Sequence, residues 1–80
     1  MIKVNILFFG ATAEAVGARE LEMNFADAVK SNEALAEIKL QLPQLNEHKL
    51  LFAINQEYAN GSETVENGDE LAVFTAVSGG

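Results

Sequence analysis

The sequence predicts a small α+β domain in which one main helix packs on one face of a mixed sheet of four to five strands. Two patterns support this prediction. Apolar and polar residues alternate in two segments near the start of the chain and again toward its end, whereas the apolar residues of a central segment recur at helical spacing. A helix laid over one face of a sheet buries the apolar sides of both. A length of 80 residues indicates a single domain, residues 1–80.

The first two expected strands, residues 2–9 and 19–25, form a hairpin with a long connection. Side chains of a strand alternate between two faces. The face expected to join the core carries Ile2, Val4, Ile6 and Phe8. The opposite face carries Lys3, Asn5, Leu7 and Phe9. The connection, residues 10–18, contains two glycines and is expected to be a loop with a helical turn at 12–16.

The central segment is expected to be the main helix. Ser31 or Asn32 can cap its first turn, because their side chains accept a hydrogen bond from a free backbone N–H. The apolar residues at helical spacing are Ala34, Leu35, Ile38 and Leu42. Pro43 is expected to end the helix, since it has no backbone N–H to donate.

The remaining strands complete the sheet. Residues 49–55 are expected to form a strand, residues 62–65 a short strand, and residues 71–76 the last strand. Asn67-Gly68 predicts a turn before the last strand, because both residues tolerate positive φ. This order is that of the β-grasp, or ubiquitin-like, fold. In that fold the first and last strands lie side by side and parallel at the centre of the sheet.

The same alternation predicts apolar side chains on the face that the helix does not cover. The outward apolar residues of the first strand are Leu7 and Phe9, and those of the last strand are Ala72 and Phe74. Tyr58, in the loop after the third long strand, could extend this patch. An exposed aromatic patch usually marks a partner surface. The alternative is that Phe9 or Phe74 is covered by a loop of its own chain.

Charge and composition narrow the class of function. Twelve acidic and five basic residues give a net charge of −7, so nucleic acid and membrane surfaces are not expected partners. The chain has no Cys and one His, His48, so no thiolate or multi-His metal site is expected. No apolar run approaches the roughly 18 residues of a membrane span, and we expect a cytoplasmic protein. An acidic run without a calcium-loop pattern, expected to be a solvated face, comprises Glu63, Glu66, Asp69 and Glu70.

The sequence ends on two glycines, Gly79 and Gly80, and residues 75–80 are expected to form a flexible tail. Because glycine has no Cβ, such a tail can pass through a narrow channel. A carboxylate at its tip could be delivered into another protein's active site and attack the α-phosphate of ATP. A sulfur donor would convert the resulting acyl-adenylate to a thiocarboxylate, whereas an amine would give an isopeptide.

These features together resemble the MoaD-type small subunits of molybdopterin synthase, which are sulfur carriers with a ubiquitin-like fold. The resemblance covers nearly the whole chain. It is carried by the opening MIKV…LFFG, the segments NEALAEI, LLFAINQEYA and VENGDELAVF, and the ending VSGG. One departure is that the family often has two prolines where this chain has Thr75 and Ala76.

The resemblance implies a sulfur-transfer cycle with two partners. An E1-like adenylating enzyme would use ATP and Mg²⁺ to activate Gly80, which a sulfur relay would convert to a thiocarboxylate. The tail would then insert into the large subunit of molybdopterin synthase and donate sulfur to cyclic pyranopterin monophosphate in molybdenum cofactor biosynthesis. The family's synthase is a heterotetramer whose catalytic side chains are expected on the large subunit, with no cofactor bound by the carrier.

The resemblance also implies contact residues. Hydrophobic contact positions of the family match Phe9, Tyr58 and Phe74, and Val77 and Ser78 are expected to contact the partner with the inserted tail. Three alternatives remain open. They are a sulfur carrier of another pathway, such as the thiamine thiazole type, a ubiquitin-like protein modifier, and a non-catalytic ubiquitin-like binding module.

Overall fold

The elements of the chain follow the expected order, with additions. The computed structural model describes residues 1–75. The elements are β1 (Ile2–Phe8), α1 (Ala11–Val16), β2 (Glu20–Phe25), β3 (Val29–Lys30), α2 (Ser31–Gln41), the 3₁₀ helix η1 (Pro43–Glu47), β4 (Leu50–Ile54), β5 (Glu57–Tyr58), β6 (Thr64–Val65) and β7 (Glu70–Thr75). The tail was expected to begin at Thr75, which is instead the last residue of β7 and pairs with Leu50 of β4.

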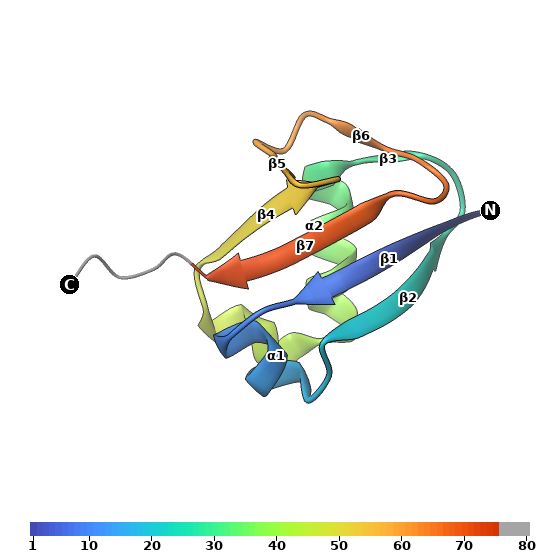
Figure 1. The fold of residues 1–80 in the computed structure, drawn as a ribbon. Helices are drawn as coiled ribbons and strands as arrows, with labels where there is room; N and C mark the ends of the chain where they lie inside the picture. The colour runs from blue at the N-terminus through green and yellow to red at the C-terminus, as the bar shows by residue number, and fades with distance from the viewer. Residues whose placement is uncertain (76–80) are drawn as a thin grey trace.

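The main sheet has five strands in the order β2-β1-β7-β4-β5 (Figure 1). β1 and β7 are parallel neighbours at its centre, whereas β1 pairs with β2, and β4 with β5 and β7, in antiparallel fashion. The predicted hairpin and the predicted parallel central pair are both confirmed. The first and last strands therefore share one surface on each side of the sheet.

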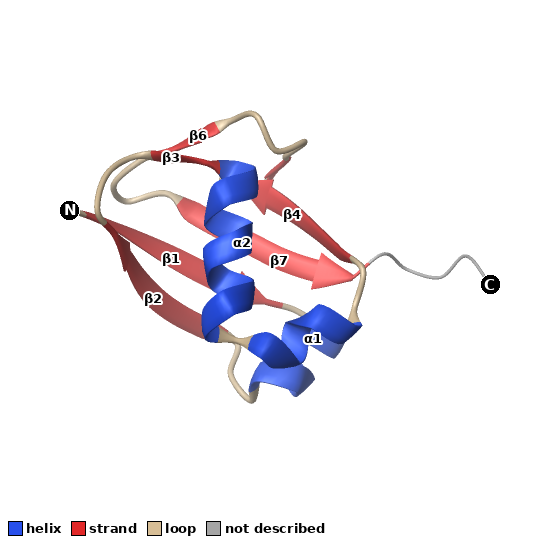
Figure 2. Cartoon of the chain, turned by 180° about the vertical axis from the view of Figure 1, so that it is seen from behind, coloured by secondary structure: helices blue, strands red, loops and turns tan. Residues whose placement is uncertain are grey.

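A second, two-stranded sheet lies outside the main one. β6 forms where residues 62–65 predicted a short strand, but it pairs with β3, through Val29 with Val65 and Lys30 with Thr64. This strand is therefore not part of the main sheet, and β3 itself was not predicted. Figure 2 shows the pair beside the N-terminal end of α2, which crosses one face of the main sheet.

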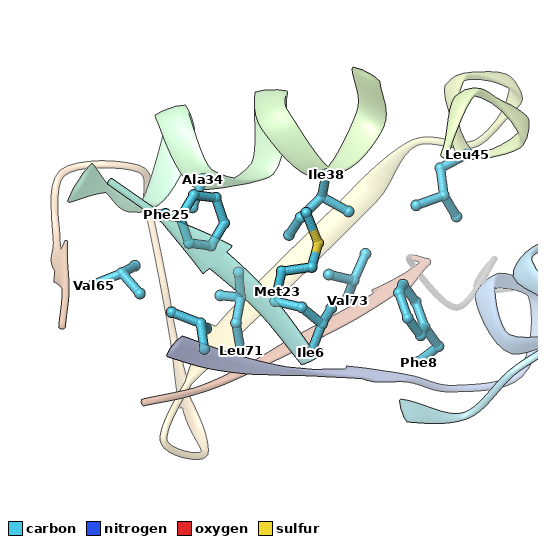
Figure 3. Close-up of a cluster of buried hydrophobic side chains, with 11 residues drawn as sticks. Ile6, Phe8, Met23, Phe25, Ala34, Ile38, Leu45, Val65, Leu71 and Val73 are labelled. Carbon is cyan, nitrogen blue, oxygen red and sulfur yellow. The ribbon is translucent and has the colours of Figure 1, made fainter. Parts of the chain in front are cut away.

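The core lies between α2 and the inner face of the sheet (Figure 3). Its buried apolar side chains are Val4, Ile6, Phe8, Met23, Phe25, Ala34, Ile38, Leu45, Val65, Leu71 and Val73. The alternation expected for the strands and the helical spacing of the central segment are thus confirmed. Leu45 comes from η1, which begins at Pro43 after α2 has ended at Gln41.

The start of α2 differs from the expected capping. The residue before the helix is Lys30, and the carboxylate of Glu33 accepts its N–H at 3.3 Å. Ser31 is instead the first helical residue and is fully buried. Its hydroxyl donates to Oε1 of Glu63, 2.8 Å away, because β6 brings the preceding loop against the helix end. The prediction that Ser31 or Asn32 caps the helix is therefore wrong, by one residue for Ser31 and by two for Asn32.

Glu63 is the centre of a small hydrogen-bonded cluster. Its carboxylate accepts the N–H of Asn60 at 2.9 Å and the N–H of Gly61 at 3.1 Å, besides the Ser31 hydroxyl. These donors, above all the Asn60 N–H and the Ser31 hydroxyl, lower the pKa of Glu63 from about 4.5 to about 2. The expectation of a merely solvated acidic face is therefore wrong for Glu63, which tethers the loop before β6 to α2.

Within residues 1–75, α1 and α2 are both too short to cross a membrane, and α2, with 11 residues, is the longer of the two.

Candidate docking face beside the end of the C-terminal strand

The face of the main sheet opposite α2 carries a continuous apolar surface. The register places Leu7 of β1 beside Ala72 of β7, and Ala72 beside Ala53 of β4. Phe74 lies beside Leu51 of β4 in the same way. We call this surface the docking face and define it by Leu7, Phe9, Leu51, Tyr58, Ala72 and Phe74. Ala53, which pairs with Tyr58, is buried on this side of the sheet.

Its aromatic side chains reach solvent. Phe9 is 53% exposed and Tyr58 is 81% exposed, and Phe74 between them is half-buried. The rings of Tyr58 and Phe74 are tilted, with an interplanar angle of 58° and centroids 5.8 Å apart, which is a geometry that aromatic pairs favour. The alternative in which Phe9 is covered by its own chain is wrong. Phe74 is covered only in part, and its neighbour is the exposed Tyr58.

An open hollow separates Phe9 from Phe74. It has a volume of about 460 Å³ and is lined by Phe9, Gly10, Ala11, Ala72, Phe74 and Thr75. The two aromatic side chains contribute large apolar walls, while Gly10, Ala11 and Ala72 are too small to fill the space between them. The hollow includes Thr75, the residue at which β7 ends, so it adjoins the point where the C-terminal five residues begin.

Carboxylates lie on the same side of the sheet. The register places Glu20 beside Leu7, and it places Asn5 between Glu22 of β2 and Glu70 of β7. Lys3 lies 4.0 Å from Glu22 in an exposed ion pair, which contributes little to stability. The docking face is therefore an apolar surface with an acidic border on the side of β2.

The structure brings together three of the residues expected to contact a partner and does not address the others. Phe9, Tyr58 and Phe74 share the docking face. Val77, Ser78, Gly79 and Gly80 lie outside the described residues, so their roles stay predictions.

Two residues of this region were missed. Leu51 is 37% exposed beside Phe74, and the alternation of side chains along the expected strand 49–55 could have placed it on the outer face. Thr12 is fully buried next to Phe9, and no sequence pattern marks it. Across residues 1–75, no three His, Cys, Asp or Glu side chains gather in a way that could hold a metal ion.

The fold and the docking face define the chain as a ubiquitin-like β-grasp protein that presents an aromatic surface next to its C-terminal strand. Its sequence matches the ThiS family over residues 6–80. It is also 44% identical over 81 residues to the molybdopterin synthase sulfur carrier subunit of Haemophilus influenzae, covering 96% of this chain and 99% of that protein. The chain therefore belongs to the ThiS family and, within it, to the molybdopterin synthase sulfur carrier subunits.

Solved structures show the same fold. The chain superposes on SAMP1 from Haloferax volcanii with a TM-score of 0.83 and 26% identity, covering 98% of this chain and 99% of that one. It also superposes on a chain in the complex of subunits 1 and 2 of the molybdopterin-converting factor from Helicobacter pylori, with a TM-score of 0.70 and 21% identity. That match covers 99% of this chain and 100% of the other, and it concerns the fold alone.

Proposed function

We propose that the chain carries sulfur for a molybdopterin synthase on the carboxyl group of Gly80. The observation that carries this proposal is the position of the docking face, whose hollow adjoins Thr75. A partner seated on the face would lie next to the start of the five C-terminal residues. Five residues span at most about 17 Å when extended, so the partner's active site would have to lie within that reach.

The chemistry requires two partner enzymes. The first partner is an E1-like adenylating enzyme that uses ATP and Mg²⁺. In its active site the Gly80 carboxylate attacks the α-phosphate of ATP and releases pyrophosphate. A sulfur nucleophile then displaces AMP from the acyl-adenylate and leaves a thiocarboxylate. In the second, the large synthase subunit, the thiocarboxylate sulfur attacks cyclic pyranopterin monophosphate and forms a thioester with it. Water then cleaves the bond between this sulfur and the Gly80 carbonyl, so the sulfur stays on the product and Gly80 returns to a carboxylate.

The composition of the docking face supports the large subunit as the partner bound there. Buried aromatic side chains contribute much of the binding energy at protein interfaces, and Phe9, Tyr58 and Phe74 are exposed enough to be buried by a partner. The acidic border at Glu20 and Glu22 would favour a partner with basic side chains beside its apolar surface. The Helicobacter pylori chain of the same fold was solved in a protein–protein complex of subunits 1 and 2 of the molybdopterin-converting factor.

The test is intact-mass analysis after incubation with the cognate adenylating enzyme, ATP, Mg²⁺ and a sulfide source. We expect the mass to rise by the difference between one sulfur and one oxygen. Deletion of Gly80 should abolish sulfur transfer to the precursor while the fold remains, because residues 1–75 already contain the core. Ala76→Ser, which keeps the length and the terminal glycines, is the matched control. Full sulfur transfer by the deletion variant would falsify the mechanism.

A protein modifier is the second candidate, because SAMP1, a small archaeal modifier protein, is 26% identical to this chain. A modifier would use the same activated carboxylate but transfer it to a lysine amine. Mass analysis of the protein isolated from its native cells distinguishes the two functions. A thiocarboxylate supports the sulfur carrier, a lysine-linked adduct supports the modifier, and an unmodified terminus under sulfur-replete conditions supports a plain binding module.

A further inference from the structure

The hydroxyl of Thr12 lies between the ends of the two central strands. Asn5 of β1 donates its N–H to the carbonyl of Asp69 at 3.0 Å. The same parallel register, continued from Asn5 to Phe9 on one strand and from Asp69 to Val73 on the other, places the N–H of Phe9 opposite the carbonyl of Val73. At this step the Phe9 N–H donates to Oγ1 of Thr12 at 3.0 Å, and that hydroxyl lies 2.8 Å from the Val73 carbonyl.

The hydroxyl thus continues the ladder between β1 and β7 through a side chain. Oγ1 of Thr12 also lies 2.9 Å from the carbonyl of Phe9, so its single proton is shared between two carbonyl acceptors. The side chain is fully buried, and an unpaired buried hydroxyl would be destabilising. Valine occupies nearly the same volume as threonine but has no hydroxyl, so it would fill this position without forming the hydrogen bonds to Phe9 and Val73.

The insertion of Thr12 coincides with the opening of the hollow. Two hydrogen bonds in series span a wider gap than the single bond of a normal ladder. The chain turns away from β7 at Gly10, whose φ is 56°, and enters α1. The hollow opens at this divergence, with Phe9 on one wall and Phe74, next to Val73, on the other.

We propose that Thr12 is a positioning residue of the docking face, because its hydroxyl sets the separation of Phe9 and Phe74 and thereby the width of the hollow. The inference rests on the proposed function of the docking face as the site for the large synthase subunit. Thr12 itself contacts no partner, because it is fully buried, and it acts through the backbone of Phe9 and Val73.

The test compares Thr12→Val, which removes the hydroxyl at constant shape, with Thr12→Ser, which keeps it. Ser31→Ala is the matched control, because Ser31 is also fully buried and donates its hydroxyl, but to Glu63 at the N-terminal end of α2. The full chain of each variant is titrated with the cognate large subunit by calorimetry at a temperature where it is folded. Thr12→Val should weaken binding about tenfold, equivalent to about 1.4 kcal/mol.

Thr12→Ser and Ser31→Ala should each bind within about twofold of the wild type, because neither removes the bridge between the central strands. A Thr12→Val chain that binds like the wild type would overturn the proposal. A Ser31→Ala chain that loses as much affinity as Thr12→Val would also overturn it, since the loss would then follow general destabilisation.

Amide hydrogen exchange gives a readout that does not depend on the partner. In the wild type, the Phe9 amide should be protected to a similar degree as the Asn5 amide of the same ladder. Rapid exchange at Phe9 in the folded wild type would overturn the proposal, even if Thr12→Val proves too unstable to study. Failure of the wild type to bind the large subunit would instead count against the proposed function, while exchange at Phe9 still tests whether the Thr12 hydroxyl holds the Phe9 amide.

Discussion

The two sides of β7 carry similar residues in different surroundings. Leu71 and Val73 point toward α2 and are fully buried, whereas Ala72 and Phe74 point to the opposite side and are half-buried. The inner residues are covered by the chain's own helix. Among residues 1–75, the outer residues lie beside their neighbours on the sheet, and the ring of Phe74 packs against the ring of Tyr58. The difference indicates that the inner side of one strand maintains the fold while its outer side is available to another molecule.

The largest expected effect is on the inner side. Leu71→Ala should lower the free energy of unfolding by about 2–5 kcal/mol, because it removes buried methyl groups and leaves a cavity beneath α2. Urea denaturation followed by circular dichroism measures this change. Phe74→Ala is the matched control from the outer side and should cost less, because Phe74 is half-exposed. Equal losses in the two variants would contradict the contrast between the faces.

The second prediction concerns the outer side. Phe74→Asp should weaken binding to the large subunit by about 2 kcal/mol or more, because it places a charge where an aromatic anchor is expected. The melting temperature should change much less than the affinity. Thr64→Asp introduces the same charge on the exposed side of β6, away from the docking face, and should bind normally. If Phe74→Asp unfolds the protein instead, Phe74 belongs to the core.

The third prediction concerns the cluster around Glu63, which belongs to neither side of β7. The pKa of Glu63 is lowered to about 2, so its contribution to stability is present above about pH 4.5 and is lost as the pH falls toward 2. Glu63→Gln should therefore be less stable than the wild type at neutral pH, and the difference should shrink across that range. Thermal melts from pH 7 to pH 2 measure it. Unchanged affinity for the large subunit at pH 7 would confirm that the cluster serves the fold alone.

The smallest expected effect is at the turn between β4 and β5. Gln56 has φ of 72°, a conformation that a residue with a Cβ adopts at a cost. Gln56→Gly should stabilise the protein by up to about 1 kcal/mol, measured by urea denaturation. Because this turn supports Tyr58, the affinity for the large subunit is the companion measurement, and it should not change. A loss of stability would contradict this prediction, because it would show that the Gln56 side chain stabilises the fold by more than its backbone strain destabilises it.

Local sequence patterns predicted the part of the fold that depends on alternation and helical spacing. The inner positions of β1 and the buried residues of α2, such as Ile6 and Ile38, follow directly from those periods. The same reasoning placed Phe9 and Phe74 on one outer face, and the two residues line the same hollow. These features depend on residues close together in the sequence and on one assumption about which strands are neighbours.

The features that escaped prediction depend on contacts between distant segments. The pairing of Val29 with Val65 requires the loop before β6 to reach the start of α2. The residues next to Val29 and Val65 show no sequence pattern that indicates this pairing. Ser31 was expected to cap its own helix but donates to Glu63, which lies 32 positions away. Thr12 was missed for the same reason, since its role depends on the carbonyl of Val73.

β7 occupies the middle of the main sheet, although it is the last of its strands along the chain. Asn5 pairs with Glu70, so β1 acquires its parallel neighbour only after nearly all of the domain has been synthesised. Such non-local pairing delays folding relative to local contacts. A nascent chain that has not yet been synthesised as far as residue 70 lacks β7 at the centre of its sheet. Prematurely terminated translation products would therefore remain unfolded and open to proteolysis, rather than persisting as folded domains that compete for the partner.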